Sequence, residues 1–353
     1  MRSVISKSSS DTAEKARDCM VEDMNALPEM VEVIVVTHNS AKHIEACIDS
    51  IAVSGGLSVV VDNASTDDTV KIIRSRYPEV RLIETRENLG YGKGLNLGFR
   101  GTKSEFVIFS NPDVVFMPES IQRMVNHLRH HPGLAITAPQ QMFPDRSWQR
   151  SYGDLPGIWS GIRDAAGITS FRNQLRRHFW PRRLDRKPRE VPYLDGAVLT
   201  VRRKAFLEIG GFDEAFFFYS EEADLCARFR IAGWKVEFLP AAEVIHIRGA
   251  SSTTAEAPDR FVRYMVESQF LLATKHLPRQ RARAYAMLQI GNFSRLGLTY
   301  RILQWFSGND PSVGNRIRIF DAYRKMWKEF SRRPELAYAA NQDGDSRQPK
   351  RVH

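Results

Sequence analysis

The chain has 353 residues, and its 51 Lys and Arg exceed its 41 Asp and Glu by a formal net charge of +10. Hydrophobic residues make up 42% of the sequence, which is enough to pack a core and excludes a wholly disordered chain. Its 22 Gly and 17 Pro are too few for a collagen-like chain, and the wide spacing of Cys19, Cys47 and Cys226 argues against a zinc ribbon or a disulfide scaffold and favours a reducing compartment.

The N-terminal part of the chain alternates between predicted strands and helices. Residues 1–29 are polar and aperiodic, so we expect a flexible leader, and they contain no apolar stretch typical of a secretory signal. VEVIVV from Val31 and LSVVVDN from Leu57 predict two buried strands. Between them, apolar residues recur at the spacing of one helix face, at Ile44, Cys47, Ile48 and Ile51. Ser65, with Asp68 three residues later, predicts the N-cap of the next helix.

The same alternation continues through the next fifty residues. VRLIET predicts a third strand, and NLGYGKGLNLGF predicts a glycine-punctuated loop that runs into a helix. EFVIFSNPD predicts a fourth strand, Pro118–Leu128 a helix, and LAITAP a fifth strand. Buried strands that alternate with helices are typical of an α/β fold, in which a mostly parallel sheet has helices on both faces.

The later part of the chain is less regular and more basic. Residues 140–190 are rich in Arg, Trp, Pro and Gly, and we expect an irregular insertion there. Ordered structure is predicted to return at Tyr193, with a helix at Lys204–Ile209. The basic excess in Phe171–Glu190 and after Ser251 favours an anionic partner, such as nucleic acid, an acidic membrane surface or a diphosphate, but a solvated basic face explains it equally well.

No stretch of about 18 residues lacks charge, so no membrane span is predicted. Ala284–Phe306 mixes apolar residues with Arg295 and Arg301. Such a segment can lie on a membrane surface, or it can be an ordinary amphipathic helix packed on the rest of the protein.

Polar residues follow four consecutive predicted strands. They are Thr37-His38-Asn39, Asp62-Asn63, Asn88 and Asn111-Pro112-Asp113. Ligands of open α/β sheets bind outside the carboxyl ends of the strands, so we expect these residues to converge on one binding edge. Turns also favour Asn and Asp, which would account for one or two of them but not readily for four.

Each of these motifs has a chemical interpretation and a plainer structural one. Asp62 can accept a hydrogen bond from the imide N–H of uracil or thymine, or can simply cap a turn. The glycines after Asn88 let the backbone approach a ligand, and Lys93 adds a positive charge. Asp113 suits a hard divalent cation that bridges a diphosphate, although it too can belong to a strand-end turn.

A second acidic cluster opens a predicted helix at Glu221, Glu222 and Asp224. Acids at a helix N-terminus are favoured by the helix dipole, which is the simplest explanation. The aromatic run before them, Phe216 to Tyr219, offers another, because a carboxylate walled by aromatic rings can have a raised pKa and act as a general base. Glu221 and Glu222 diverge by roughly 100° on a helix, so they can have different roles.

Taken in order, these motifs resemble the inverting glycosyltransferase family 2 of the GT-A fold, which has a Rossmann-like sheet. They are most similar to its bacterial rhamnosyltransferase-type branch, which acts on cell-surface glycans. The motifs that carry the resemblance are VIVVTHNS, VVVDNASTDDT, NLGYGKGLNLGF, IFSNPDVVF, LDGAVLTVRRKAFLEIGGFDEAFFFYSEEADLCARFRIAGW and VIHIRGASS. The resemblance implies a GT-A domain over residues 30–252, followed by a basic, mainly helical region over residues 253–353.

The resemblance also implies a role for each matching residue. The donor's nucleotide would lie against Thr37, Asn39, Asp62, Asn63, Asn88 and Gly90. Asp113 and His246 would bind Mg²⁺ or Mn²⁺, with Asn111 and Arg248 close to the diphosphate. Gly196 and Ala197 would form the floor under the donor sugar and the acceptor. Glu222 would be the catalytic base, with Glu221 as the second choice.

Two residues depart from the family pattern. Asn111 stands where the metal motif usually has its first Asp, which implies weaker metal binding. Glu222 stands where the base is usually Asp and is one methylene longer, so the backbone or the acceptor must adjust to place its oxygen about 2.6–3.2 Å from the proton that it removes.

The implied function is that of an inverting hexosyltransferase. It would move a sugar, rhamnose in this branch, from a dTDP- or UDP-linked donor to a hydroxyl group of a glycan or polyprenyl-diphosphate-linked acceptor. We expect a cytoplasmic protein associated with the inner face of the membrane. The alternative is a catalytically inactive module that binds nucleotide-sugar or glycan. Nucleic acid is not an expected partner, because the sequence contains no recognised nucleic-acid-binding motif.

Overall fold

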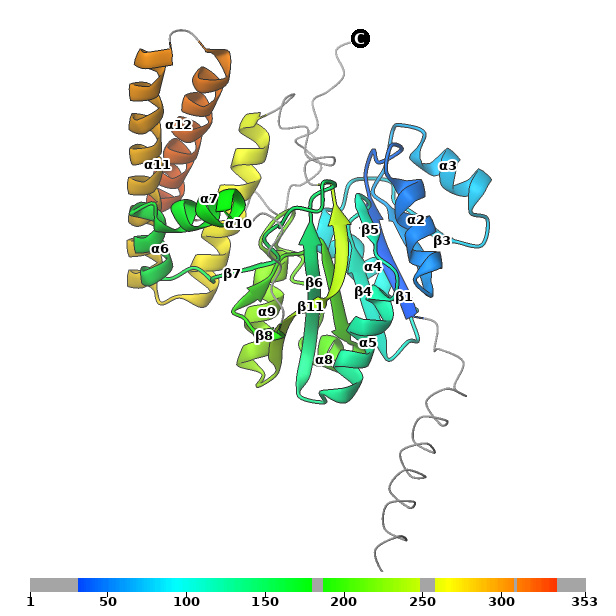
Figure 1. Cartoon of the computed structure of the whole chain (residues 1–353). Coiled ribbons are helices and arrows are strands. Elements are labelled where there is room, and N and C mark those ends of the chain that lie inside the picture. Colours follow the sequence, from blue (N-terminus) through cyan, green and yellow to red (C-terminus); the bar gives the residue numbers. More distant parts are fainter. Residues whose placement is uncertain (1–30, 180–186, 248–257, 308–309, 335–353) are drawn as a thin grey trace, which may run out of the picture.

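The computed structural model describes residues 31–179, 187–247, 258–307 and 310–334. Its centre is a nine-stranded sheet (Figure 1). The first half of the sheet is parallel and runs in the order β3 (Arg81–Glu84), β2 (Gly56–Asp62), β1 (Val31–Thr37), β4 (Phe106–Ser110). The predicted leader, residues 1–29, lies outside the described residues.

The second half of the sheet mixes strand directions. It continues from β4 through β10 (Val198–Arg202), β6 (Leu134–Met142), β11 (Lys235–His246) and β5 (Val114–Phe116), with β8 (Arg189–Glu190) also paired to β11. β10 is antiparallel to both of its neighbours, whereas β6 and β11 are parallel. The predicted α/β sheet is therefore confirmed, and β5 is an additional strand that its three residues were too short to predict.

Helices cover both faces of the sheet, because each central strand is buried on both sides. On β1, Val33 and Val35 face one core and Ile34 and Val36 face the other, as the two-residue period of a strand requires. The first core is closed by α2 (Ile44–Val53), α3 (Thr69–Arg76) and α5 (Ser120–His130). The second is closed by α4 (Tyr91–Phe99), α8 (Arg203–Glu208) and α9 (Glu221–Ile231).

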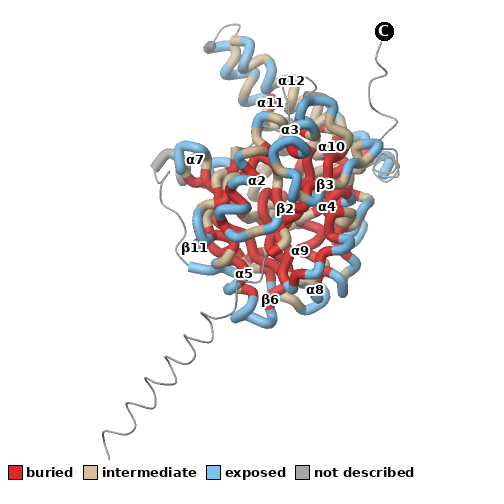
Figure 2. Tube along the Cα trace, turned by 90° about the vertical axis from the view of Figure 1, so that its right-hand side faces the viewer, coloured by how far each residue is buried: buried red, intermediate tan, exposed pale blue. Residues whose placement is uncertain are grey.

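Three long helices form the C-terminal region, α10 (Pro258–His276), α11 (Arg279–Ser307) and α12 (Pro311–Arg332). They have their own hydrophobic core, which contains Trp327 and Phe330 at no more than 1% exposure. The buried residues are concentrated in the sheet and its flanking helices, whereas the outer ends of α11 and α12 are more exposed (Figure 2). This confirms the predicted helical C-terminal region. Within the described residues, no helix is long and apolar enough to cross a membrane.

The predicted irregular segment 140–190 is more ordered than expected. It contains β7 (Tyr152–Gly153), α6 (Ile158–Ala165) and α7 (Ile168–Phe179), and β7 pairs with β9 (Tyr193–Leu194) in a small second sheet. α6 packs closely on α11, since a Cβ atom on Gly161 would lie 2.9 Å from the Leu288 side chain. Its stability therefore comes from tertiary packing that the local sequence does not reveal.

The predicted N-cap at Ser65 is wrong, because α3 begins four residues later, at Thr69. The Asp62 carboxylate accepts a hydrogen bond from the Ser65 N–H at 2.9 Å, which folds this segment into a turn. At the start of the helix, the Asp67 carboxylate instead accepts a hydrogen bond from the Thr69 N–H at 3.0 Å. Side-chain hydrogen bonds of this kind compete with helix formation wherever Asp or Ser precedes a helix.

Candidate active site

The polar strand ends converge as predicted. In the parallel register, Thr37 lies opposite Asp62, and the Asn63 N–H donates to the Thr37 carbonyl at 2.8 Å. All three side chains are buried. Among the described residues, each has one polar atom without a hydrogen-bond partner: Thr37 Oγ1, Asp62 Oδ1 and Asn63 Oδ1. Orphaned polar atoms are rare in protein interiors, so three together at a sheet edge indicate a ligand site.

Asn39 and Asn88 lie at the same edge, but their side chains hold the backbone in place. Asn39 has a φ of +54°, and its amide oxygen accepts from the Thr66 N–H at 2.7 Å. The Asn88 amide oxygen accepts from the Gly90 N–H at 3.0 Å. Lys93, by contrast, is exposed on α4.

Gly90 occupies a position that no other residue fits without strain. Its φ is +84°, and a Cβ atom there would lie 2.4 Å from the Phe217 carbonyl oxygen. The Asn63 side-chain amide donates to the Gly90 carbonyl at 2.9 Å, and the Tyr91 N–H donates to the Phe217 carbonyl at 3.0 Å. Gly90 therefore joins the strand-end pocket to the loop that precedes α9.

Asp113 and His246 form a further buried pair of polar side chains. Asp113 Oδ1 lies 3.5 Å from His246 Nε2, and it has no hydrogen-bond partner among the described residues. The antiparallel pairing of His246 with Val114 in β5 and β11 brings the two together. Asn111 reaches the same edge, where its backbone N–H donates to the Ala197 carbonyl at 2.9 Å.

Two glutamines orient His246. Its Nδ1 lies 3.1 Å from Gln141 Oε1 and 2.9 Å from Gln149 Oε1. The amide nitrogen of Gln149 donates to the His246 carbonyl and that of Gln141 to Asp195, which fixes both amide oxygens toward the ring. Nδ1 must therefore carry the proton in the neutral ring, which leaves the Nε2 lone pair directed at Asp113 and free for a metal ion.

The residues present fit a divalent cation with few protein ligands. No group of three or more His, Cys, Asp and Glu side chains forms a metal cluster within the described ranges. Mg²⁺ is usually held by one or two carboxylates and completed by water and substrate phosphates. An aspartate oxygen and an imidazole nitrogen that face each other match that pattern for Mg²⁺ or Mn²⁺.

Glu221 and Glu222 diverge at the start of α9. Glu221 is 4% exposed and lies against Gly92, and its Oε2 has no hydrogen-bond partner among the described residues. Glu222 lies over Gly196, since a Cβ atom on this glycine would be 3.4 Å from Glu222 Cβ and Cγ. The absence of a side chain at Gly196 therefore leaves space for Glu222, and Ala197 beside it is buried.

The electrostatic environment affects the pKa values of Glu221 and Glu222 differently. Burial and then the charge of Asp195 raise the pKa of Glu222 to about 7, against a smaller opposing effect of Arg150. Burial and then the charge of Glu222 raise the pKa of Glu221 well above its ordinary value. Glu222 is therefore suited to exchange a proton near neutral pH, whereas Glu221 is a better neutral hydrogen-bond donor.

Tyr91 lies close to Glu221 and Glu222 and also to Asp113. Its hydroxyl donates to the Gly196 carbonyl at 3.2 Å. Burial raises its pKa well above the ordinary value, and four carboxylates add to the effect, those of Glu221, Glu222, Asp113 and Asp195. These four carboxylates are therefore all close enough to the Tyr91 hydroxyl to affect its ionisation.

The third acid of the cluster, Asp224, belongs to a different network. It is fully buried and lies 2.7 Å from Arg228 Nε, Lys275 Nζ and His276 Nε2. Burial acts to raise its pKa, but the hydrogen bond to His276 and the charge of Arg228 lower it to about 2. Asp224 therefore ties α9 to α10 rather than serving the site.

Four residues of the site were not predicted from the sequence: Arg150, Gln141, Gln149 and Asp195. Asp195 precedes Gly196, and that adjacency was the available signal. Gln141 lies near the end of β6, and Gln149 and Arg150 follow this strand. All three belong to the segment expected to be irregular, where no periodic pattern marks them. Arg248 lies outside the described residues.

Known proteins resemble this chain in sequence and in fold. The family model described as glycosyl transferase family 2 matches residues 32–210, and the one described as N-terminal domain of galactosyltransferase matches residues 186–250. The N-acetylglucosaminyl-diphospho-decaprenol L-rhamnosyltransferase of Mycobacterium tuberculosis (strain H37Rv) is 34% identical over 265 residues, which are 71% of this chain and 86% of the relative. The rhamnosyltransferase WbbL of Escherichia coli (strain K12) is 22% identical over 62% of this chain and 83% of its own.

Solved structures agree on the fold. A mannosyltransferase from Pyrobaculum calidifontis, in complex with GDP-Man and Mn²⁺, has a TM-score of 0.52 and 19% identity and covers 89% of this chain and 87% of its own. GalNAc-T7 with UDP, GalNAc and Mn²⁺ has the same TM-score at 13% identity and covers 89% of this chain and 57% of its own. The family match over half of the chain and the relative at 34% identity agree: this chain is a glycosyltransferase and belongs to glycosyl transferase family 2.

Proposed function

We propose that this glycosyltransferase moves rhamnose from a nucleoside-diphosphate donor to a hydroxyl group of a polyprenyl-diphosphate-linked sugar, with inversion at the anomeric carbon. The names of the mycobacterial and E. coli relatives support rhamnose, and that of the mycobacterial relative supports the lipid diphosphate acceptor. The observation that carries the mechanism is the half-buried Glu222, with a pKa of about 7, beside the Asp113–His246 pair.

The nucleotide would occupy the pocket at the ends of β1 and β2. Asp62 Oδ1 is an unpartnered acceptor within the described structure, suited to the imide N–H of uracil or thymine. Thr37 Oγ1 and Asn63 Oδ1 offer further polar contacts. Uracil and thymine present the same imide, so these groups are compatible with either a UDP-linked or a dTDP-linked donor.

Asp113 Oδ1 and His246 Nε2 would hold the cation against the donor's diphosphate. When bound, Mg²⁺ or Mn²⁺ supplies positive charge that stabilises the leaving diphosphate. Gln141 and Gln149 keep the imidazole in the tautomer that presents Nε2.

Glu222 would act as the general base. As the acceptor oxygen forms its bond to the anomeric carbon, its proton moves to the Glu222 carboxylate. The bond from that carbon to the diphosphate oxygen breaks on the opposite side, and the nucleoside diphosphate leaves with the electron pair. Glu221, kept neutral by its raised pKa, can donate a hydrogen bond in the same site.

A comparison of Glu222→Gln with Glu222→Asp tests this assignment. With dTDP-rhamnose or UDP-rhamnose and a lipid-diphosphate-linked N-acetylglucosamine, wild type should form a rhamnosylated product. Glu222→Gln should bind the donor normally but turn over about 10²–10⁴-fold more slowly, which is the usual contribution of a general base. Glu222→Asp should retain measurable turnover, because it keeps the carboxylate. Normal turnover by Glu222→Gln would refute the assignment.

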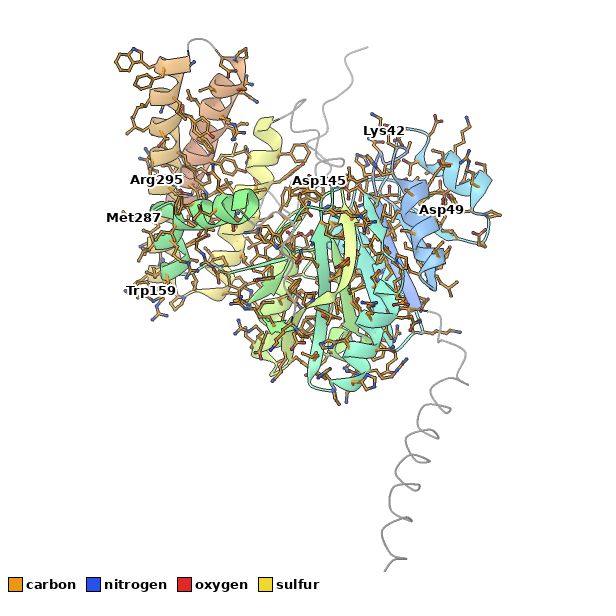
Figure 3. All side chains as sticks on the ribbon, in the orientation of Figure 1. Lys42, Asp49, Asp145, Trp159, Met287 and Arg295 are labelled. Carbon is orange, nitrogen blue, oxygen red and sulfur yellow. The ribbon has the colours of Figure 1, made fainter. Side chains whose placement is uncertain are left out.

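The acceptor lipid suggests that the C-terminal region rests on the cytoplasmic face of the membrane. Trp159 of α6 and Met287 of α11 lie on the same outer flank of the molecule, together with Arg295 (Figure 3). Farther along α11, Trp305 is 83% exposed and Phe306 is 76% exposed. Exposed aromatic side chains among arginines are typical of segments that bind the interface of anionic membranes.

Liposome flotation tests this contact with the full-length protein. Trp305→Ser combined with Phe306→Ser should reduce flotation with anionic vesicles, while the exposed Leu207→Ser on α8 serves as a matched control. Equal flotation of both variants would exclude a membrane contact through this end of α11. The opposite face of α11 packs on the rest of the protein, where it buries Tyr285 and Ala286. This is the second alternative that the sequence left open for Ala284–Phe306.

A further inference from the structure

Within its described residues the structure contains a cavity of about 860 Å³ that lies apart from the polar strand ends. Its walls come from the segment 148–154, from α6 and α7, from the segment 189–193, and from Gln269 of α10 and Tyr285 of α11. Its volume is within the usual range of pockets that bind small molecules. Neither the donor site nor the metal-binding pair uses it.

The cavity wall has an excess of positive charge. It contains four arginines and three carboxylates. Asp154 forms an ion pair with Arg163 at 2.6 Å, and Glu190 lies 3.8 Å from Lys235. Among the described residues, the remaining groups are three arginines, Arg150, Arg172 and Arg189, which face one carboxylate, Asp164.

Two of these three arginines, Arg150 and Arg189, contact tyrosine side chains rather than carboxylates. Arg189 lies 5.6 Å from the ring centre of Tyr152, and its guanidinium donates to the Tyr152 hydroxyl at 3.4 Å. Arg150 donates to the Tyr193 hydroxyl at 3.4 Å. Neither forms an ion pair within the described part of the chain, so their guanidinium groups retain the capacity to bind an anion such as a phosphate.

The wall of the cavity adjoins residues of the candidate active site. Gln149 contacts His246, while its two neighbours, Trp148 and Arg150, line the cavity. Arg150 is close enough to Glu222 and Asp195 to affect the pKa values in the site, and Tyr193 in the cavity wall is two residues from Asp195. A ligand in this cavity would therefore have one end near Glu222.

We infer that this cavity binds the diphosphate of the lipid-linked acceptor, with Arg150, Arg172 and Arg189 as its anion-binding side chains. The inference rests on the proposed function and identifies where the acceptor lies. The diphosphate sits among the arginines, the sugar extends past Arg150 to Glu222, and aromatic residues such as Tyr285 contact the first isoprene units. The donor approaches from the opposite side, as a single displacement with inversion requires.

Farnesyl diphosphate, a short soluble polyprenyl diphosphate, tests the inference without any turnover. Its binding to the full-length enzyme is measured by calorimetry for wild type, Arg172→Gln, Arg189→Gln and a control, Arg230→Gln, in which the exposed arginine lies on α9 outside the cavity. Each cavity variant should bind about tenfold more weakly, the effect expected for losing one charge-assisted hydrogen bond. The control should match wild type, and saturating UDP should not displace the probe.

Unchanged affinity in both cavity variants, or displacement of the probe by UDP, would overturn the inference. Displacement would mean that the arginines serve the donor's diphosphate instead. The proposed function is tested separately: if rhamnosyl transfer occurs but the acceptor KM is unaffected by Arg172→Gln and Arg189→Gln, only the inference fails. If the arginines bind the probe but no rhamnose is transferred, only the proposed function fails.

Discussion

The pKa of Glu222 predicts how the rate of transfer depends on pH. A base with a pKa of about 7 is about one-tenth deprotonated at pH 6 and about nine-tenths deprotonated at pH 8. kcat/KM should therefore rise about tenfold over this range. A glutamate with its ordinary pKa, near 4.5, would already be fully ionised at pH 6, and the profile would be flat.

Two neighbouring charges should move this profile in opposite directions. Asp195 raises the pKa of Glu222, so Asp195→Asn should shift the rise toward lower pH. Arg150 lowers it, so Arg150→Gln should shift the rise toward higher pH. The assay is kcat/KM at subsaturating acceptor and saturating donor between pH 5.5 and pH 8.5, with circular dichroism at each pH to verify folding.

A flat profile for the folded wild-type enzyme would refute the reasoning, because it would mean that the base is ionised throughout. A sloped profile that neither variant shifts would mean that a group other than Glu222 titrates. Shifts of both variants in the same direction would show that the substitutions change the geometry of the site rather than its charge.

Three further predictions follow from the structure. Because the folded state raises the pKa of Glu222, ionisation of this group destabilises the fold as the pH rises from about 4.5 through 7. Glu222→Gln should therefore raise the free energy of unfolding by on the order of 2 kcal/mol at pH 8 but leave it unchanged at pH 4. Urea unfolding that shows no pH-dependent difference between the variant and wild type would contradict this. Asp224→Asn should lower that free energy by about 3 kcal/mol, since it removes the buried carboxylate charge that Arg228, Lys275 and His276 share. Asp321→Asn, at a partly exposed pair, should change it by less than about 1 kcal/mol, and equal effects in urea unfolding would argue against the buried network. Gln149→Leu should weaken Mn²⁺ binding about 10–100-fold in the presence of UDP by releasing His246, and an unchanged affinity in calorimetry would exclude this orienting role.

The convergence of the polar strand ends could be predicted, because it follows from the two-residue period of the strands and from their parallel direction. Runs of buried β-branched residues locate the strands, and parallel strands bring their carboxyl ends to one edge, so Thr37 and Asp62 had to meet. The offset of about 100° between neighbouring residues of a helix likewise predicts that the Glu221 and Glu222 side chains point in different directions.

The rest of the site depends on contacts between distant segments. Gln149 and Arg150 belong to a segment without periodicity, and their positions depend on partners about 45 to 100 residues away, Tyr193 and His246. α6 was missed for the same reason, since it is held by α11. At Ser65 the sequence pattern is compatible with both a helix N-cap and a turn. The turn forms because the Asp62 carboxylate accepts a hydrogen bond from the Ser65 N–H.

The contacts between α9 and α10 limit how this enzyme can be divided. α10 supplies Lys275 and His276 to the buried Asp224, and its Ser268 hydroxyl donates to the Phe218 carbonyl at 2.8 Å in the loop that precedes α9. A fragment that ends at residue 250, where the matched family segments end, would lose Lys275, His276 and this support. The catalytic domain is therefore not a transferable module: a chimera that exchanges the C-terminal helices to change acceptor preference must keep a cation facing Asp224.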